Sequence, residues 1–256
     1  MQRPSDEDIL VFENQIREEQ VNVHPLISVP LPMSILQDEY QEGSNPNFLA
    51  KISELDTQYR MLRKTRGDGN CFFRAFSFGL VEAIWSLTEE KRKQHIAMLE
   101  ANITKLLEDA GFDRVAYEDF YSELFITLRE NATADYLATE WESAPHRSHS
   151  LVVLLRLVAS AYLRAHSVEY EPFLWELETG MTTYCQRFVE CLGVESDQIH
   201  IIVLGKALGV DVRVAYLDGG EGPLNTLYFK ADDAEEAEIC INVLYRPGHY
   251  DLLYLQ

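Results

Sequence analysis

Cysteine is scarce in this sequence, with only 4 residues in 256 (Cys71, Cys185, Cys191 and Cys240). This density is far below that of a small secreted domain held together by disulfides, so we expect free thiols. The sequence contains no Cys-x-x-Cys pair. Cys185 and Cys191 also lack a neighbouring histidine, which argues against a zinc site.

Long hydrophobic runs are also missing. No apolar stretch approaches the roughly 18 residues that a membrane-spanning helix needs, and the mean hydropathy is slightly negative. The N-terminal segment MQRPSDEDIL carries early acidic residues and no apolar core of the kind found in signal peptides. We therefore expect a cytosolic protein, with the nucleus also open, and no membrane partner.

Basic residues are in short supply, because 22 Lys and Arg face 42 Asp and Glu for a net charge of −20. Such a chain is a poor match for nucleic acid or anionic lipid, which are bound by basic patches. Its field would instead speed the approach of a basic partner. The alternative is that the acidity only keeps the protein in solution, and the composition leaves both interpretations open.

Hydrophobic residues make up 46% of the chain, enough for a sizeable core in one large domain or two small ones. Apolar residues at helical spacing between Ser5 and Gln20 predict an acidic amphipathic helix. The prolines that follow (Pro25, Pro30 and Pro32) predict an extended linker. We expect a helical arm with its linker over residues 1–33 and the main domain over residues 34–256. Packing of the arm on that domain is the open alternative.

The remaining pattern is helical first and extended last. Helices are predicted for Ser34–Glu42 and Phe48–Arg63, and the stretch 85–190 has mostly helical periodicity. Short segments rich in β-branched and aromatic residues then predict strands over Val210–Leu217, Ile239–Arg246 and Asp251–Leu255. The expected fold class is α+β, with a helical region packed on a small mixed sheet.

One cysteine lies in a segment suited to chemistry. Gly67-Asp68-Gly69-Asn70 predicts a tight turn, and an apolar helix is expected to follow it, which places Cys71 at or just before the helix N-terminus. The positive end of a helix dipole stabilises a thiolate at such a position. Free main-chain N–H groups there can also bind the oxyanion formed during acyl transfer.

A cysteine nucleophile needs a base, and His249 in Tyr245-Arg246-Pro247-Gly248-His249-Tyr250-Asp251 is the candidate. In an extended segment, residues 249 and 251 point to the same face, so Asp251 is placed to orient the imidazole. Taken alone, Cys71 reads as a small buried hydrophobe and His249 as a structural residue. Together they predict a cysteine hydrolase whose substrate the spacing does not reveal.

Two motifs carry a family resemblance. Thr65–Ala75, with its Asp-Gly-Asn-Cys turn, resembles the cysteine motif of the ovarian-tumour (OTU) class of deubiquitinases. Leu244–Asp251 resembles the histidine motif of the otubain branch, and Glu195–Ile201 resembles a third otubain segment. The similarity runs from about Ser34 to the C-terminus, which implies a papain-like OTU fold.

The resemblance implies a deubiquitinase that hydrolyses the isopeptide bond at the ubiquitin C-terminus, acting on polyubiquitin or ubiquitinated proteins. Cys71 would attack, His249 would serve as base and then acid, Asp251 would orient His249, and Asp68 would shape the oxyanion loop. No metal or cofactor is implied. The implied partners are ubiquitin and polyubiquitin, with ubiquitin-conjugating enzymes as a further candidate, and the protein is expected to be a monomer.

The sequence also departs from the otubain pattern. Gln198 stands where a histidine is expected, and Ala144–Ser150 lacks the usual acidic residues, which leaves linkage preference open. Relatives with an N-terminal helical arm use it to hold the acceptor ubiquitin, which is one hypothesis for the helix over residues 5–20. Two other functions stay open: inhibition of ubiquitin-conjugating enzymes without cleavage, and hydrolysis of another ubiquitin-like modifier.

Overall fold

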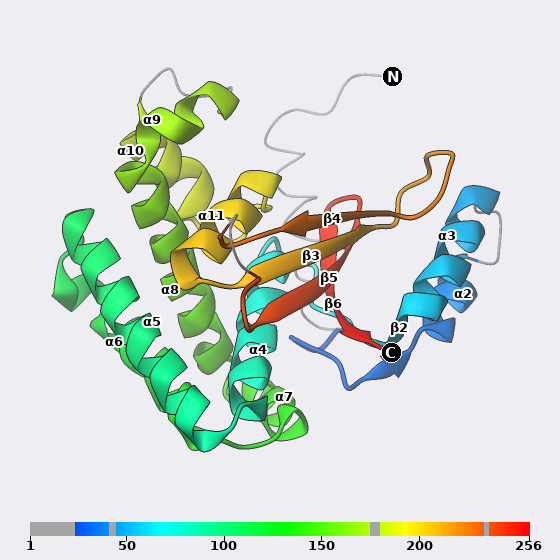
Figure 1. The fold of residues 1–256 in the computed structure, drawn as a ribbon, viewed down its shortest axis with the longest axis horizontal. Helices are drawn as coiled ribbons and strands as arrows, with labels where there is room; N and C mark the ends of the chain where they lie inside the picture. Colours follow the sequence, from blue (N-terminus) through cyan, green and yellow to red (C-terminus); the bar gives the residue numbers. More distant parts are fainter. Residues whose placement is uncertain (1–23, 41–44, 175–179, 233–235) are drawn as a thin grey trace, which may run out of the picture.

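The computed structural model describes residues 24–40, 45–174, 180–232 and 236–256. Its centre is a six-stranded mixed sheet in the order β1-β2-β6-β5-β3-β4, with helices on both sides (Figure 1). Among the strands of the described residues, β3 and β5 run parallel, and the other neighbouring pairs are antiparallel. The strands are β1 (Leu31–Pro32), β2 (Tyr59–Arg63), β3 (Asp211–Tyr216), β4 (Asn225–Phe229), β5 (Cys240–Arg246) and β6 (His249–Leu255).

The helices lie mainly between β2 and β3 in the chain. They are α2 (Ser34–Tyr40), α3 (Pro46–Gln58), α4 (Cys71–Ser86), α5 (Glu89–Asp109), α6 (Arg114–Glu130), α7 (Ala134–Ser143), α8 (Pro145–Ala165), α9 (Ser167–Tyr170), α10 (Met181–Tyr184) and α11 (Gln198–Leu208). A 3-10 turn, η1 (Glu171–Phe173), follows α9, and a π-helical turn, η2 (Cys185–Val189), follows α10.

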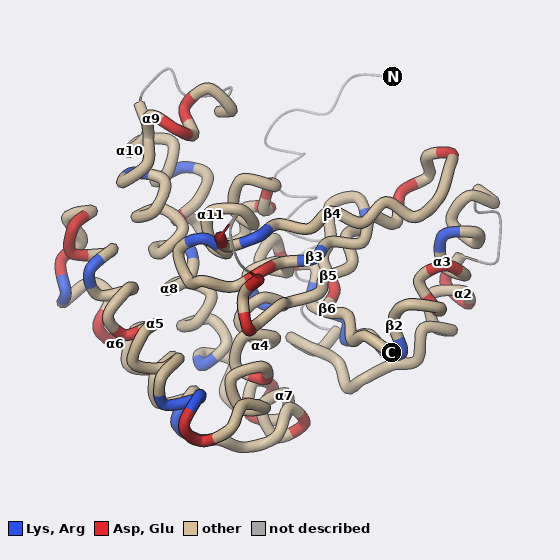
Figure 2. The backbone as a smooth tube through the Cα atoms, viewed as in Figure 1, with Lys and Arg blue, Asp and Glu red and all other residues tan. Residues whose placement is uncertain are grey.

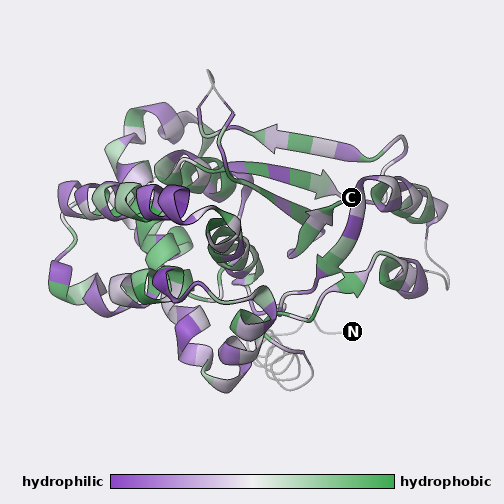
Figure 3. Ribbon diagram, turned by 60° about the horizontal axis from the view of Figure 1, so that its bottom comes forward, coloured by the Kyte–Doolittle hydropathy of each residue, from purple (hydrophilic) through white to green (hydrophobic). Residues whose placement is uncertain are grey.

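Helix α4 connects the sheet to the helical region. It packs against β5 and β6 on one side and against α8 on the other, which explains why it is apolar nearly all round. Helix α8 in turn contacts α5, α6, α7 and α11, so the helices share one continuous core with this face of the sheet. Hydrophobic residues accordingly concentrate on the strands and on the helices beside them (Figure 3).

The opposite face of the sheet carries a second, smaller core. Helices α2 and α3 cover it, and residues such as Leu36, Ile52 and Leu55 meet Leu244 and Leu253 of the sheet. The described part of the proline-rich segment also lies on the domain, because β1 pairs with β2, and Leu26, Ile27 and Met33 are buried. Each core is therefore formed by helices packed against one face of the same sheet.

The predicted α+β class is confirmed, and so are the three predicted strands, to within a few residues at their ends. The expected helix over Phe48–Arg63 is wrong in its last part. Helix α3 ends at Gln58, where Tyr59 becomes extended, and Tyr59–Arg63 forms β2 between β1 and β6. The apolar spacing there fits either period, and the backbone partners on both sides favour the strand. The predicted helix over residues 5–20 lies outside the described residues.

Acidic and basic residues are spread over α2, α3, α5, α6 and the loop between β3 and β4 (Figure 2). Within the described ranges, no single helix is both long and apolar enough to cross a membrane.

Candidate active site

Cys71 occupies the first position of α4, where it is 4% exposed. The N-cap residue is Asn70, whose side chain makes no capping bond to the first turn of the helix. Its amide oxygen instead accepts hydrogen bonds from Arg156 Nη2 (2.9 Å) and from the Gly193 main-chain N–H (3.0 Å). The N–H groups at the start of α4 are therefore not used by the cap, and they surround the sulfur with positive potential.

Asp68 is fixed by a buried arginine. Arg74, one turn into α4 and fully buried, donates to both carboxylate oxygens of Asp68, at 2.8 and 2.7 Å. The Asn70 main-chain N–H donates to the same carboxylate at 3.0 Å. Burial raises the pKa of Asp68, but the bonds from Arg74 and Asn70 outweigh it and leave that pKa below its ordinary value. The carboxylate thus faces Arg74 and shapes the loop from inside.

A second buried arginine joins this loop to another one. Arg156 of α8 is 1% exposed, and it donates to the carbonyl oxygens of Gly69, Val189 and Val194 as well as to Asn70. Its guanidinium also lies over the ring of Phe73, 4.4 Å from the centroid. Burial lowers the pKa of Arg156 to about 10, which still leaves it charged at neutral pH. Arg156 therefore holds the loop before Cys71 against the segment 189–194.

His249 and Asp251 come from the first residues of β6 and share one face of the strand, the arrangement that alternation predicts. His249 Nε2 lies 2.9 Å from Asp251 Oδ1. Asp251 is fully buried, and its carboxylate also accepts from the Thr65 N–H (2.9 Å) and from Arg246 Nη2 (2.5 Å). Because Nε2 faces Asp251, Nδ1 is the ring nitrogen left for a second partner.

Cys71 is the second side chain that interacts with His249, and this interaction is one cause of the raised pKa of that histidine. Burial lowers the pKa of His249, but the bonds to Asp251 and Cys71 and their negative charges more than compensate and raise it to about 9. Burial likewise raises the pKa of Asp251, whereas His249 and Arg246 bring it below its ordinary value. At neutral pH the raised pKa of His249 favours an imidazolium beside the Cys71 side chain. A cysteine next to a histidine that an acid orients is the arrangement that acyl transfer by a thiol requires.

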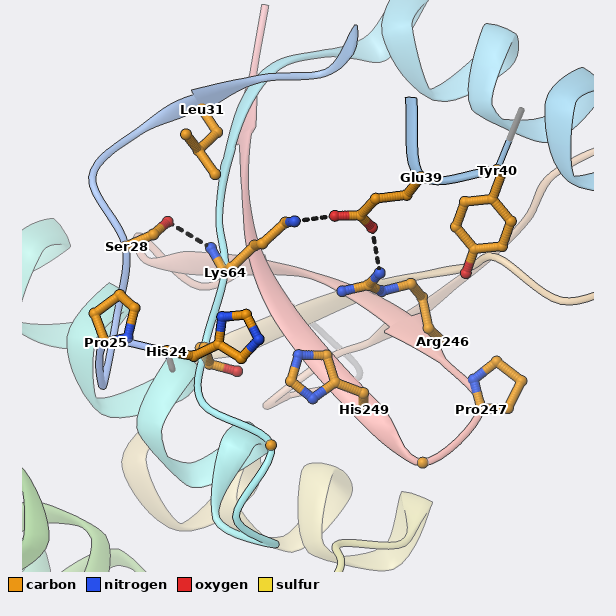
Figure 4. A pocket seen from close by; sticks show the side chains of 13 residues that line it. His24, Pro25, Ser28, Leu31, Glu39, Tyr40, Lys64, Arg246, Pro247 and His249 are labelled. Atoms are coloured by element: carbon orange, nitrogen blue, oxygen red, sulfur yellow. Dashed lines mark hydrogen bonds and ion pairs between the residues drawn. The ribbon is translucent and has the colours of Figure 1, made fainter. Parts of the chain in front are cut away.

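A cavity of about 700 Å³ opens beside this pair, lined by His249, Arg246, Glu39, Lys64 and His24 among others (Figure 4). It is polar where Glu39 lies between Lys64 and Arg246, and His249 forms part of its wall. Within the described residues, no group of three or more His, Cys, Asp and Glu side chains is placed to hold a metal.

The structure brings three of the predicted residues, Cys71, His249 and Asp251, together at one point, although their segments are far apart in the chain. Asp68 lies in the adjoining loop, with its carboxylate turned to Arg74. Sequence reasoning missed the three arginines that hold the site. Arg74 is the one basic residue of the apolar helix α4, Arg156 interrupts the apolar run Leu151–Val158 of α8, and Arg246 ends an apolar strand, so the signal was present in the sequence.

Gln198, which stands where the otubain pattern has a histidine, is the first residue of α11, and its amide donates to Tyr216 Oη at 2.9 Å. His200, two residues on, is buried and accepts from the Asp197 N–H through Nδ1, which fixes the start of α11. The departure at Gln198 therefore lies on the surface beside the site, and it leaves the contacts of Cys71, His249 and Asp251 unchanged.

Comparison with known proteins gives consistent matches. The family model for peptidase C65, otubain, matches residues 19–255. The human protein named ubiquitin thioesterase OTUB1 is 38% identical over 97% of this chain and 90% of its own length. An Arabidopsis thaliana OTU-domain deubiquitinating enzyme is 34% identical over 93% of this chain and 83% of its own.

Solved structures agree with these sequence matches. A complex described as h/ceOTUB1, ubiquitin aldehyde and UBCH5B~Ub superposes with a TM-score of 0.86 at 31% identity, covering 98% of both chains. A ceOTUB1 complex with ubiquitin aldehyde and UBC13~Ub gives 0.85 at 31% identity, over 95% of this chain and 98% of that one. The family match covers nearly the whole chain, and the fold agrees over the same length. The chain therefore belongs to the otubain family of cysteine peptidases, C65.

Proposed function

We propose that this otubain is a deubiquitinase that hydrolyses isopeptide bonds at the ubiquitin C-terminus, in polyubiquitin chains or on ubiquitinated proteins. The observation that carries the proposal is the contact of Cys71 at the start of α4 with a His249 that Asp251 orients. A cysteine, a base and an orienting carboxylate are the components of acyl transfer by a thiol. The names of the relatives identify the acyl group as ubiquitin.

In this mechanism the Cys71 thiolate attacks the carbonyl carbon of the ubiquitin C-terminal glycine, and a tetrahedral oxyanion forms. His249 then gives its proton to the departing lysine amine, which leaves a thioester between ubiquitin and Cys71. Water attacks the thioester with its proton passing to His249, and ubiquitin leaves as the free carboxylate. Asp251 keeps the imidazole in one orientation throughout, through the bond to Nε2.

The oxyanion is assigned to main-chain N–H groups of the loop from Asp68 to Cys71, other than that of Asn70, which donates to the Asp68 carboxylate. The loop is held from below by Arg74 and Arg156, so its N–H groups are oriented before substrate arrives. Donors fixed in this way stabilise the developing charge without a cost of reorganisation. Asp68 accordingly acts as a positioning residue, since its carboxylate is engaged with Arg74.

The deciding experiment incubates the wild type and Cys71→Ala with di-ubiquitins of every linkage under reducing conditions, read by gel. Cleavage by the wild type alone is the expected result, and it also reports the linkage preference. If no linkage is cut at high enzyme concentration, the proposal fails for ubiquitin. A panel of probes derived from other ubiquitin-like modifiers then tests whether one of those is the substrate.

A second function is supported by the solved complexes. Two of the similar structures contain an OTUB1 together with ubiquitin aldehyde and either UBCH5B~Ub or UBC13~Ub. We infer that this chain also binds ubiquitin-charged conjugating enzymes and restrains chain synthesis. Cys71→Ala separates the two roles, because it should abolish cleavage and still slow chain assembly in a reconstituted reaction.

Three further predictions concern the whole chain. We propose that residues 1–33 supply an arm that contacts ubiquitin and a linker whose last part, from Leu26 to Met33, lies on the catalytic domain of residues 34–256. We also propose that the protein acts in the ubiquitin pathway of the cytosol. The net charge of −20 supports attraction to a basic partner such as ubiquitin. Deleting residues 1–23 should then weaken cleavage of di-ubiquitin more than hydrolysis of a fluorogenic mono-ubiquitin substrate.

A further inference from the structure

Arg246 holds the carboxylate that orients the candidate base. It is the last residue of β5 and pairs across the sheet with His249 of β6. Its Nη2 donates to Asp251 Oδ2 at 2.5 Å, while Oδ1 of the same carboxylate serves His249 and the Thr65 N–H. Both oxygens of Asp251 are thereby engaged, which restricts the carboxylate to one rotamer.

Arg246 is itself anchored from another element. Its Nη1 donates to Glu39 Oε2 of α2 at 2.9 Å, and the other oxygen of Glu39 accepts from Lys64 (Figure 4). Within the described chain, the buried Nε of Arg246 has no hydrogen-bond partner, so the two terminal nitrogens carry the polar contacts of this guanidinium. Glu39 and Asp251 therefore hold the guanidinium between them.

We propose that Arg246, anchored by Glu39, is a positioning residue. It fixes the Asp251 carboxylate and competes with His249 for the negative charge of that carboxylate. Glu39, Arg246, Asp251 and His249 form one alternating chain of charges that leads from α2 at the cavity to Cys71. The inference rests on the proposed function only in calling His249 the base; the contacts themselves are independent of any substrate.

The alternation of charge determines the sign of each effect. The positive charge of Arg246 partly cancels the effect of the Asp251 carboxylate and so lowers the pKa of His249. The negative charge of Glu39 partly cancels that of Arg246, which reduces this lowering. The other ionisable groups facing this chain are Cys71 from α4, Lys64 after β2, His24 across the cavity, and Glu195, which lies beside Gly248. Single substitutions of Arg246 and Glu39 leave these four groups in place.

The test measures the titration midpoint of His249 by NMR on protein labelled with ¹⁵N-histidine. The Cys71→Ala background removes the Cys71 side chain as a second influence on His249, and comparison with His249→Gln assigns the signal among the 7 histidines. Arg246→Gln should raise the midpoint by about one pH unit, because Asp251 is no longer opposed. Glu39→Gln should lower it by a few tenths of a pH unit, because Arg246 is no longer neutralised.

Matched controls exist in the Arg129–Glu100 pair, which joins α6 to α5 away from the site. Arg129→Gln and Glu100→Gln should leave the midpoint unchanged, and Arg246→Lys should stay close to the wild type because it keeps the charge. Shifts of opposite sign in Arg246→Gln and Glu39→Gln support the proposal. An unchanged midpoint in both, or shifts in one direction, would overturn it.

Activity gives the second readout. With Cys71 present, Arg246→Gln should lower kcat on a fluorogenic ubiquitin amide about tenfold through the misplaced base, and Arg246→Lys should recover part of the loss. If wild-type protein hydrolyses no ubiquitin substrate, the proposed function fails, whereas the NMR midpoints still decide the role of Arg246.

Discussion

The two halves of the candidate site are held in different ways. The nucleophile half, from Asp68 to Cys71, is supported by Arg74 and Arg156, which are 0% and 1% exposed within the helical core. The base half, His249 with Asp251, is supported by Arg246 and Glu39, whose side chains are 17% and 29% exposed at the wall of an open cavity. One half is part of the interior of the protein, and the other can be reached from its surface.

This difference predicts where each half is vulnerable. Buried cations held by fixed acceptors cannot be released without leaving polar groups unpaired, so damage to the nucleophile half should appear as lost stability. Partly exposed charges are screened by water, so damage to the base half should appear mainly as altered chemistry. Substitutions in the nucleophile half should therefore lower the free energy of unfolding more than substitutions in the base half.

The largest effect is expected for Asp68→Ala, which leaves the buried Arg74 without its carboxylate. Breaking one partner of a buried ion pair costs about 3–5 kcal/mol in the free energy of unfolding. The measurement is urea unfolding beside the wild type. In the double variant Asp68→Ala/Arg74→Met, much of the stability should return while hydrolysis of ubiquitin substrates stays low. Equal instability of the single and double variants would contradict the ion-pair argument.

The same pair gives a pH dependence with a definite sign. Because the pKa of Asp68 is depressed in the folded protein, its stabilising contribution is present above the ordinary aspartate pKa of about 3.9. It is lost as the pH falls through the folded value. The unfolding free energy of the wild type should therefore drop more steeply below about pH 4 than that of the double variant.

The next effect is expected for Arg156→Met, which keeps an apolar stem of similar length and removes the donor. Four acceptors, at Gly69, Asn70, Val189 and Val194, would lose a bond that Arg156 now supplies. We expect a loss of about 2–4 kcal/mol in the free energy of unfolding, measured by urea titration. Arg129→Met, which removes an arginine from a pair on the surface, serves as the control and should cost less than about 1 kcal/mol.

The candidate catalytic residues of both halves could be predicted from the sequence, but the contact between the halves could not. Cys71 was identifiable because a Gly-rich turn precedes an apolar helix, and Asp251 was tied to His249 because alternation is a local property of a strand. The approach of Cys71 to His249 depends on the packing of α4 beneath β5 and β6, which is tertiary information. The family motifs supplied that link, whereas periodicity alone did not.

Other features escaped prediction for physical reasons. Tyr59–Arg63 has spacing that suits a helix, and only the partners β1 and β6 make it a strand. Arg74 and Arg156 were visible as charges in apolar helices, but their acceptors lie on other segments: the Asp68 carboxylate for Arg74, and main-chain carbonyls with the Asn70 amide for Arg156. A sequence can indicate that a buried cation needs partners; it does not say which loops provide them.

The next prediction compares glycines at corresponding positions in the two halves. Gly69 has φ +75°, and a Cβ there would lie 2.2 Å from the carbonyl oxygen of Gly193. Gly69→Ala therefore combines a disfavoured backbone with a collision against main chain, and we expect a loss of about 2–3 kcal/mol in the free energy of unfolding. The loop before Cys71 should also shift, so kcat on a fluorogenic ubiquitin amide should fall at least tenfold.

The smallest effect is expected for Gly248→Ala, the counterpart in the base half. Gly248 has a similar φ of +76°, but the nearest atom to an added Cβ is the flexible carboxylate of Glu195 at 3.5 Å. Only the backbone cost of about 1 kcal/mol should appear in urea unfolding, because the side chain of Glu195 can move aside. The two variants share the backbone penalty, so their difference measures how firmly each half is packed. Equal losses would mean that the base half is as rigid as the nucleophile half, and that the open cavity beside His249 does not loosen it.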